Sequence, residues 1–439
     1  MKKKVISAFL AATMVCGMLA GCSSGTSQED GGSEKTTIRF LSAMELVDED
    51  MINAFEEANP DIEVDFDYVD SGNYSAKFAA LASSNEVPDV FWTQSGYYCD
   101  QINEGLLMDI SEYLDGDNYE GDATWRDTFV PALLENLQGI VQSGCGELDS
   151  YDYGVPFTMT TVAVMYDKAL YSELGLSVPE TWDDFMSNCE ALKNAGYTAL
   201  SVQSNTCIDW MPRLFWDQYC REEIEDEGKT FESGEMTFKT ESVQKGLEMY
   251  KKLWDNGYFP ENFMTSDLDT TAQLFIQGKL AQVLIAPDKL EYIMENAPDT
   301  MELGTYVLPG ADGLPSRTLG GASNIFAVSA DTENPEAAVK LVQYLTSKTN
   351  FETDEGLQYS SSGLVNVERS PELDEILEGY NAAAENGFCP ETFVPTTIST
   401  EINTEFKENL IPNYLLGQTT LDDVTTKLQD MYDSYLADK

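Results

Sequence analysis

The sequence predicts an α/β protein of two lobes, each built around a central, mostly parallel sheet flanked by helices. A chain of 439 residues is too long for one simple core and suits two bodies of ordinary size. Strand-like and helix-like patterns alternate in both halves, as in parallel sheets whose crossovers are helices. Between the halves, residues 153–168 (YGVPFTMTTVAVMYDK) are typical of a strand that passes from one body to the other.

Residues 153–168 carry the strongest strand signal in the chain. Apolar side chains recur there at period two, which predicts one buried face. They are Val155, Phe157, Val162, Val164 and Tyr166. The interruption at 158–161 is small and polar, and it suits passage between two bodies. The preceding run, 138–152, is expected to be a loop because it holds few apolar residues, and 169–175 is expected to be a short helix that ends at Gly175.

The first half alternates strands and helices in the order expected of a parallel sheet. The helix predicted at 48–58 has acidic residues in its first turn and is stopped by Asn59 and Pro60. The strand at 62–68 alternates apolar and acidic residues, which predicts a buried face that ends with Tyr68. The other predicted elements are a strand at 38–43, a helix marked by Tyr74, Phe78 and Leu81, and a strand at 87–92.

The second half repeats this style. Residues 181–184 (TWDD) form a capping box, which predicts a helix that buries Cys189 and is closed by Gly196. Residues 275–287 predict the end of a helix, a turn and a buried strand. After Gly320 and Gly321 we expect a strand, then a helix capped by Asn334 with Pro335 at its first position. Further helices are predicted near 209–219, 243–254 and 416–436.

The composition excludes several classes of function. The chain has 25 basic and 77 acidic residues, a formal net charge of −52. Such a surface repels phosphate backbones and anionic headgroups, which argues against nucleic-acid binding, charge-driven membrane binding and a highly anionic ligand. The absence of histidine excludes Ser-His-Asp and Cys-His nucleophile systems and histidine-ligated zinc.

The cysteines leave their pairing open. Beyond Cys22 they are Cys99, Cys145, Cys189, Cys207, Cys220 and Cys389. They contain no Cys-x-x-Cys pair, which excludes zinc and thioredoxin-like sites, and six cysteines allow fifteen pairings. Cys189, on an apolar helix face, favours a buried thiol. The acidic run 114–122 is not a calcium loop, because its sixth position is Glu120 instead of glycine. No metal and no cofactor are predicted.

The N-terminus has the parts of a secretion signal. A basic start at 2–4 precedes an apolar run at 5–20, which is shorter than the roughly 20 residues of a membrane span. The motif LAGC at 19–22 resembles a bacterial lipobox, which implies cleavage before Cys22, diacylglycerol on its thiol and room for an acyl chain on its amine. Residues 23–35 are small, polar or charged, and are expected to form a flexible tether.

Several stretches share one order along the chain. They are EANPDIEV (57–64), YSAKFAALASSNEVPDVF (74–91), GLLMDISEYL (105–114), YGVPF with its sequel to 168, GLSVPETWDDFMSNCEALKNAGYTAL (175–200), FIQGKLAQVLIAP (275–287), TLGGASNIFAVSADTENPEAAVKLVQYLTS (318–347) and SSSGLVNVE (360–368). Together they resemble the extracellular solute-binding proteins of ABC importers, in particular sugar-binding relatives of the maltose-binding protein, over nearly all of residues 36–439.

The resemblance implies a periplasmic-binding-protein-like fold that captures an extracellular solute, an oligosaccharide or other carbohydrate, and delivers it to a membrane permease. It also implies a hinged cleft and three crossings between the lobes, at 155–160, 320–324 and 358–366. Small residues stand at these crossings: Thr158, Thr160, Gly320, Gly321, Ser361 and Gly363. We expect a monomeric lipoprotein on the extracellular face of the bacterial cytoplasmic membrane, with ABC transporter permease subunits as partners.

The predicted division has four parts. Residues 1–21 are the lipoprotein signal peptide, and 22–35 are the lipidated cysteine and tether. Residues 36–157 plus 322–358 form the first lobe, and 158–321 plus 359–439 form the second.

Ligands of open α/β sheets bind beyond the carboxyl ends of the strands. A sugar needs flat aromatic side chains for its ring faces, and amides or carboxylates for its hydroxyls. The candidates are Met44, Glu45, Trp92, Gln94, Ser95, Tyr97 and Tyr98 in the first lobe, Thr158 and Thr160 in the first crossing, Asp209, Trp210 and Arg213 in the second lobe, and Asn324 in the return crossing.

Some candidates carry alternatives. Trp92 closes an apolar run and could equally belong to the core, whereas Trp210, near a helix start, favours a ligand role. By the resemblance, Thr160 and Ser95 stand where relatives have an acid, and Asp288 replaces an aromatic that stacks on sugar. These departures leave the identity of the solute open.

Two other functions stay open. A surface glycoside hydrolase needs only paired carboxylates, and 77 acidic residues always supply such a pair. A structural or adhesive surface lipoprotein needs no small solute at all. New reducing ends would identify a hydrolase, and a calorimetric panel of solutes that gives no heat would identify an adhesin.

Overall fold

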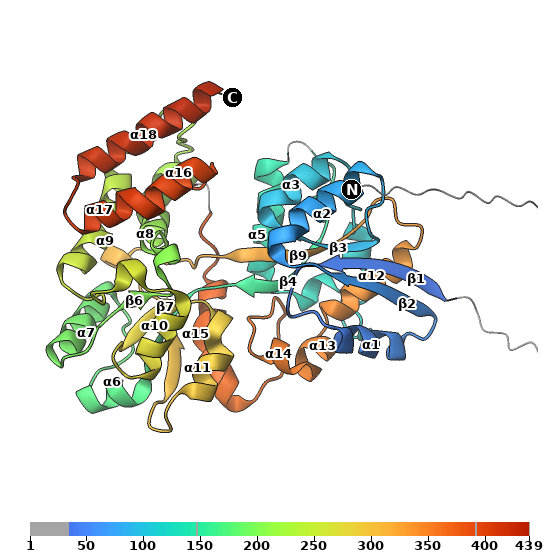
Figure 1. Ribbon diagram of the computed structural model, residues 1–439, viewed down its shortest axis with the longest axis horizontal. Helices are drawn as coiled ribbons and strands as arrows, with labels where there is room; N and C mark the ends of the chain where they lie inside the picture. Colours follow the sequence, from blue (N-terminus) through green and yellow to red (C-terminus); the bar gives the residue numbers. More distant parts are fainter. Residues whose placement is uncertain (1–34, 146–147, 391–392, 439) are drawn as a thin grey trace, which may run out of the picture.

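The computed structural model describes residues 35–145, 148–390 and 393–438, so the predicted signal peptide, Cys22 and all but the last residue of the tether lie outside it. The described residues form two bodies that lie side by side (Figure 1). Each body has its own sheet, one of five strands and one of four. The predicted two-lobed α/β class is confirmed. We call the body with five strands the first lobe and the body with four strands the second lobe.

The first lobe is arranged around a sheet with the strand order β2-β1-β3-β9-β4. Its strands are β1 (Thr36–Ser42), β2 (Ile62–Tyr68), β3 (Val90–Gln94), β4 (Val155–Thr160) and β9 (Gly321–Val328). Its helices are α1 (Glu49–Ala58), α2 (Ser71–Ser83), α3 (Ser95–Asn103), α4 (Ser111–Leu114), α5 (Pro131–Gly144), α12 (Pro335–Leu345), α13 (Lys348–Thr353) and α14 (Glu355–Gln358), with a short turn η1 (Arg126–Thr128).

The second lobe is arranged around a sheet with the order β6-β7-β5-β8. Its strands are β5 (Ala163–Asp167), β6 (Ser201–Val202), β7 (Gln282–Ile285) and β8 (Leu303–Tyr306). Its α-helices are α6 (Lys168–Leu174), α7 (Trp182–Asn194), α8 (Trp210–Arg221), α9 (Glu241–Asp255), α10 (Leu268–Ile276), α11 (Leu290–Asn296), α15 (Pro371–Glu385), α16 (Thr400–Glu405), α17 (Ile411–Leu415) and α18 (Leu421–Asp438). Its short helical segments are η2 (Asn205–Cys207), η3 (Glu222–Asp226), η4 (Phe263–Thr265), η5 (Pro287–Lys289), η6 (Ala311–Gly313) and η7 (Phe406–Leu410).

In each sheet one strand runs against the others, β9 in the first and β5 in the second, so the prediction of mostly parallel sheets is confirmed with these two exceptions. In the first lobe β2, β1 and β3 are parallel, but β9 is antiparallel to both β3 and β4. In the second lobe β6 and β7 are parallel neighbours, and β5 is antiparallel to both β7 and β8, so β6, β7 and β8 run in one direction. The alternation of strands and helices in the first half predicted its parallel part correctly. The return crossing brings β9 into the sheet in the opposite direction, and no local pattern reveals that.

The stretch at 153–168 forms two strands instead of one. β4 belongs to the first sheet and β5 to the second, and the break falls at Thr161 and Val162. Both faces of β4 and β5 are buried, so the prediction of a single buried face is wrong. In β5 the reason is that each face packs on a different core, with Val164 in one and Met165 in the other.

The lobe boundaries differ from the prediction in detail. Pairing of β4 with β9 continues to Thr160, so a boundary after residue 157 falls inside β4. Leu364, Ala384 and Phe388 pack in the first-lobe core, although the prediction assigned residues 359–439 to the second lobe. The passage of the chain from one lobe to the other therefore extends over several residues and does not occur at one position.

Most of the helix ends predicted from local sequence signals are confirmed. The capping box at Thr181 and Asp184 starts α7, and Gly175 ends α6 with a φ of 68°. Asn334 occupies the N-cap position of α12 but makes no side-chain cap hydrogen bond. The loop predicted at 138–152 is wrong in its first half, because α5 extends to Gly144.

The extension of α5 has a simple cause. Leu133, Leu137 and Val141 recur every four residues and are all buried, so they continue one apolar helix face into the polar run.

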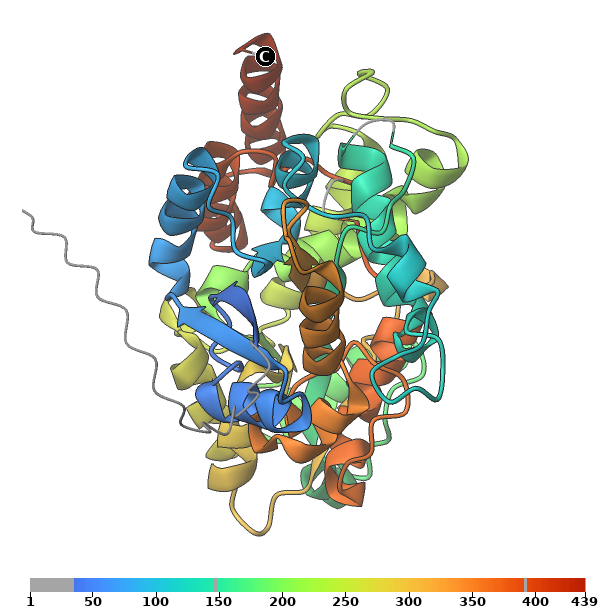
Figure 2. The ribbon, with the colours of Figure 1, turned by 90° about the vertical axis from the view of Figure 1, so that its right-hand side faces the viewer.

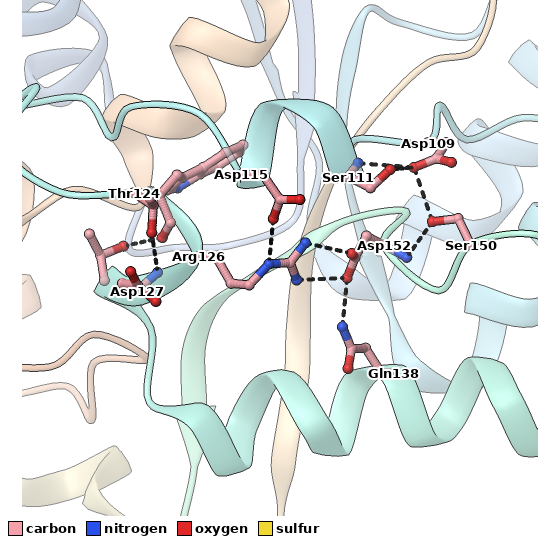
Figure 3. Close-up of polar contacts among 11 residues, drawn as sticks. Asp109, Ser111, Asp115, Thr124, Arg126, Asp127, Gln138, Ser150 and Asp152 are labelled. Atoms are coloured by element: carbon pink, nitrogen blue, oxygen red, sulfur yellow. Dashed lines mark hydrogen bonds and ion pairs between the residues drawn. The ribbon is translucent and has the colours of Figure 1, made fainter.

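A disulfide and a polar network hold the segment that leads into β4. Cys99 of α3 is bonded to Cys145, while Cys189, Cys207, Cys220 and Cys389 are free thiols; Cys189 is buried as predicted. In Figure 3 the Arg126 guanidinium lies between Asp115 and Asp152. Its Nη2 donates to Asp152 Oδ2 at 2.8 Å, and its Nε donates to Asp115 Oδ1 at 2.8 Å.

The network continues into α5 and has an electrostatic consequence. Gln138 Nε2 of α5 donates to Asp152 Oδ1 at 2.8 Å. The hydrogen bond to Asp152, more than the one to Asp115, raises the pKa of Arg126 above its usual value. The start of β4 is therefore tied to both η1 and α5.

The C-terminal helix α18 closes the second lobe. Val424, Leu428 and Tyr432 on α18 are buried in the main second-lobe core. In Figure 2, which looks onto the first lobe, this helix (dark red) projects above the other elements. No helix in the described part of the chain combines the length and apolar character that a bilayer crossing needs.

Candidate functional site

The predicted site residues of the first lobe gather at one edge of its sheet. The parallel strands β1 and β3 end at the same edge, so the residues that follow them lie close together. Directly after β1, Met44 is half-buried and Glu45 is exposed. At the end of β3, Gln94 and Ser95 are half-buried, and Tyr97 in the first turn of α3 is 47% exposed. This edge therefore presents a carboxylate, an amide, a hydroxyl and an open aromatic ring.

Trp92, in contrast, lies in the core and does not offer a stacking surface. Its side chain is 5% exposed, and its ring meets that of Tyr74 edge to face at 4.8 Å. The indole Nε1 donates to Asn324 Oδ1 at 3.2 Å, and Asn324 Nδ2 donates to Thr158 Oγ1 at 3.4 Å. The structure thus places Trp92 behind the site, where it orients Asn324. Tyr98 is fully buried as well.

The three predicted crossings meet through hydrogen bonds. The Oγ1 of Thr160 lies 2.7 Å from Ser323 Oγ of the return crossing. Met159 N donates to Ser361 O at 3.0 Å, and Thr158 forms a bridge with Ser362. Small polar side chains of all three segments therefore lie side by side at the junction of the lobes.

In the second lobe Arg213 and Lys407 both lie near the carboxylate of Asp209. Asp209 stands at the N-cap position of α8 and is 4% exposed. Its Oδ1 lies 3.7 Å from Lys407 Nζ, and its Oδ2 lies 3.9 Å from Arg213 Nη1. The buried carboxylate is thus balanced by two cations, each beyond hydrogen-bond distance.

The other second-lobe candidates lie nearby on different elements. Trp210 is half-buried and packs against the main second-lobe core. Asp288 is exposed in η5, and its Oδ2 accepts a hydrogen bond of 3.0 Å from Gln203 Nε2. Gln203 Oε1 accepts a hydrogen bond of 2.9 Å from Ala286 N, which holds Gln203 in place. Asp288 is therefore held against Gln203, which lies two residues before Asn205 in the chain.

A cavity of about 430 Å³ opens in the second lobe beside Asp209. It is formed by η2 and the residue after it, by η4, and by α16, η7 and α17. Its lining residues are Asn205, Thr206, Ile208, Met264, Asn403, Thr404, Lys407, Glu408 and Pro412. The lining combines amides, hydroxyls and one ammonium group, which can donate to and accept from the hydroxyls of a small polar molecule.

Among the described residues, Asn403 Oδ1 in the cavity lining has no hydrogen-bond partner, and neither do the buried Asp209 Oδ1 and Tyr250 Oη. Burial, with the charge of Asp209 as a second cause, raises the pKa of Tyr250 well above its usual value, so Tyr250 lies within electrostatic range of Asp209. A buried polar atom without a partner costs about 1–3 kcal/mol. An unpartnered amide oxygen in a cavity lining, as in Asn403, is typical of a place that a ligand or ordered water completes.

Sequence reasoning missed the residues of this cavity and one residue of the first lobe. Asn403, Thr404 and Lys407 lie in a stretch without a strand signal, so the rule on carboxyl ends of strands does not reach them. Asn205 and Thr206 follow β6 and fall under that rule. Tyr68, expected on a buried strand face, is 44% exposed at the carboxyl end of β2, and its terminal position in the strand is the signal for this exposure.

The chain is similar to binding proteins over most of its length. Residues 35–350 match the family described as bacterial extracellular solute-binding protein. A multiple sugar-binding protein of Streptococcus mutans is 23% identical, covering 75% of this chain and 75% of its own. The lipoprotein LipO of Bacillus subtilis is 22% identical, covering 80% of this chain and 71% of its own.

The solved structure of the sugar-binding protein MalE from Xanthomonas citri has the same fold. It superposes with a TM-score of 0.73 at 19% identity, over 92% of this chain and 98% of that one.

Proposed function

Because the chain belongs to the family of bacterial extracellular solute-binding proteins, we propose that it captures a carbohydrate outside the cell and delivers it to the permease of an ABC transporter. The multiple sugar-binding protein of Streptococcus mutans supports a sugar as the class of solute. Neutral hydroxyl-rich solutes also suit a chain with a net charge of −52, which repels anions.

The second-lobe cavity is the observation that carries this proposal. Its volume of about 430 Å³ is in the range of small-molecule pockets, about 300–1,000 Å³. The unpartnered Asn403 oxygen is an acceptor for a sugar hydroxyl, and Lys407 is a donor. The first-lobe edge with Glu45 and Tyr97 would bind the other side of the solute.

Isothermal calorimetry with maltotriose, melibiose, raffinose and stachyose tests the function. We expect at least one of them to bind, and Asn403→Ala to weaken that binding about three- to tenfold, the value of one hydrogen bond. Asn409→Ala is the matched control, because Asn409 is exposed in η7, which directly follows α16, and its side chain hydrogen-bonds Glu405. Heat from none of the four sugars would contradict the proposed class of solute.

The same samples separate transport from hydrolysis and test closure. A hydrolase would generate new reducing ends during incubation, and we expect none. Rotation about the three crossings would bring both lobes onto the solute, because a solute that touches both favours the closed form. Small-angle scattering should then show a smaller radius of gyration with sugar bound, and an unchanged radius at saturation would contradict closure.

We further propose that the protein is a lipoprotein held at the extracellular face of the cytoplasmic membrane by Cys22. The motif LAGC at 19–22, with its basic start and apolar run, supports this, as does the likeness to the lipoprotein LipO. Residues 22–35 would serve as anchor and tether, with the two lobes free in solution as a monomer.

Replacing the anchoring cysteine should release the protein. In the Cys22→Ser variant, expressed in a Gram-positive host, we expect most of the protein in the culture medium, because the acidic lobes have no charge-based affinity for an anionic membrane. Fractionation followed by immunoblotting measures the distribution, with Cys207→Ser as the matched control. Retention of Cys22→Ser in the membrane fraction would contradict lipid anchoring at this residue.

A further inference from the structure

We propose that Tyr68, with Glu45 beside it, forms a sugar-ring subsite on the first lobe and helps to determine which solute binds. This rests on the proposed function, since it takes a sugar as the solute. Seven large hydrophobic side chains are exposed among the described residues, and Tyr68 (44%) and Tyr97 (47%) are the two most exposed aromatic rings. Both lie at the edge of the first sheet that holds the other site candidates.

Strand register places Tyr68 relative to Trp92. Tyr68 pairs with Ser42 of β1, and the neighbouring pair of Leu41 with Phe91 continues the same row to Trp92 of β3. Adjacent strands lie about 4.8 Å apart, so Tyr68 and Trp92 stand about 10 Å apart across two strands. Trp92, at the inner end of this row, is buried, whereas Tyr68, at its outer end, is exposed. The ring that is available to a solute is therefore that of Tyr68.

Glu45 supplies the polar part of the subsite. It is exposed in the turn after β1. Partial burial raises the pKa of Tyr68, and the charges of Glu45 and Asp70 raise it further, so both carboxylates lie within electrostatic range of the phenol. Asp70 already serves as the N-cap of α2, where it accepts hydrogen bonds from Gly72 N and Asn73 Nδ2. Glu45 is thus the carboxylate that can accept hydrogen bonds from sugar hydroxyls.

The fold itself makes little use of the Tyr68 ring. Along β2 the side chains of the apolar face become more exposed toward the carboxyl end: Ile62 is 8% exposed and Val64 9%, Phe66 is half-buried, and Tyr68 is exposed. Removal of the Tyr68 ring should therefore leave the core intact. An open aromatic ring beside a free carboxylate matches a sugar, whose apolar ring face stacks while its hydroxyls donate.

Calorimetry on Tyr68→Ala and Tyr68→Phe, with the sugar that gives the strongest heat among maltotriose, melibiose, raffinose and stachyose, tests the subsite. We expect Tyr68→Ala to bind about three- to tenfold more weakly at an unchanged melting temperature, and Tyr68→Phe to stay within about twofold of the wild type. Tyr151→Ala is the matched control. Tyr151 is 37% exposed and lies before the start of β4, whereas the other end of β4 reaches the site. The Tyr151→Ala protein should therefore bind the sugar with the wild-type affinity.

The outcomes separate the subsite from the function. If the wild type binds a sugar and Tyr68→Ala binds it equally well, the subsite is overturned while the function stands. If Tyr68→Ala and Tyr151→Ala weaken binding alike, the effect is not specific to this edge and the subsite is again overturned. If the wild type binds none of the four sugars, the function and the subsite fall together.

Discussion

Replacing Trp92 by alanine is expected to lower the free energy of unfolding by about 3–5 kcal/mol, the usual cost of truncating a buried tryptophan. The side chain is 5% exposed in the first-lobe core and packs edge to face on Tyr74. Its removal leaves a cavity and deprives Asn324 Oδ1 of its donor. Urea unfolding followed by circular dichroism measures the change as a shift of the midpoint.

Trp210→Ala is the matched control for this prediction. Trp210 is only half-buried at the start of α8, so its loss should shift the unfolding midpoint less and weaken sugar binding instead. Affinity must be expressed per folded molecule in both variants. A Trp92→Ala protein with the wild-type midpoint and weakened affinity would contradict its place in the core and restore the stacking role predicted from sequence.

The two tryptophans show which part of a site can be predicted from sequence. The rule that ligands gather at carboxyl ends of strands selected residues that the fold does bring to one edge, Met44, Glu45 and Tyr97. It does not tell which ring is buried. That depends on α2, whose Tyr74 covers Trp92, and on β9, which supplies Asn324 from more than 200 residues away in the chain.

Local elements were predictable because their causes are local. The capping box at Thr181, the left-handed Gly175 and the acidic first turn of α1 each decide a helix end within a few residues. The reversed direction of β9 was not predictable, because it depends on how the return crossing folds. The cavity was missed for the same reason: η2 and η7 are almost 200 residues apart in sequence, and only the fold joins Asp209 to Lys407.

Gly320→Ala is expected to destabilise the protein by at least about 3 kcal/mol, since backbone strain and a forced overlap add together. Gly320 has a φ of +109°, and a Cβ there would stand 2.0 Å from the carbonyl oxygen of Thr160. The clash is with backbone in the first crossing, which cannot turn aside as a long side chain can. Thermal unfolding of the purified variant measures the loss.

Substitutions at Gly105 and Gly139 separate the cost of backbone strain from the cost of steric overlap. Gly105 has a φ of +74° with nothing within 4 Å, so Gly105→Ala carries the strain alone and should cost about 1–2 kcal/mol. Gly139 lies inside α5 with nothing within 4 Å, so Gly139→Ala should be neutral or stabilising by up to about 1 kcal/mol. If Gly320→Ala costs no more than Gly105→Ala, the two crossings can move apart easily. A larger cost would mean that Gly320 is required for the close approach of two crossings, and that any rotation between the lobes must keep this contact.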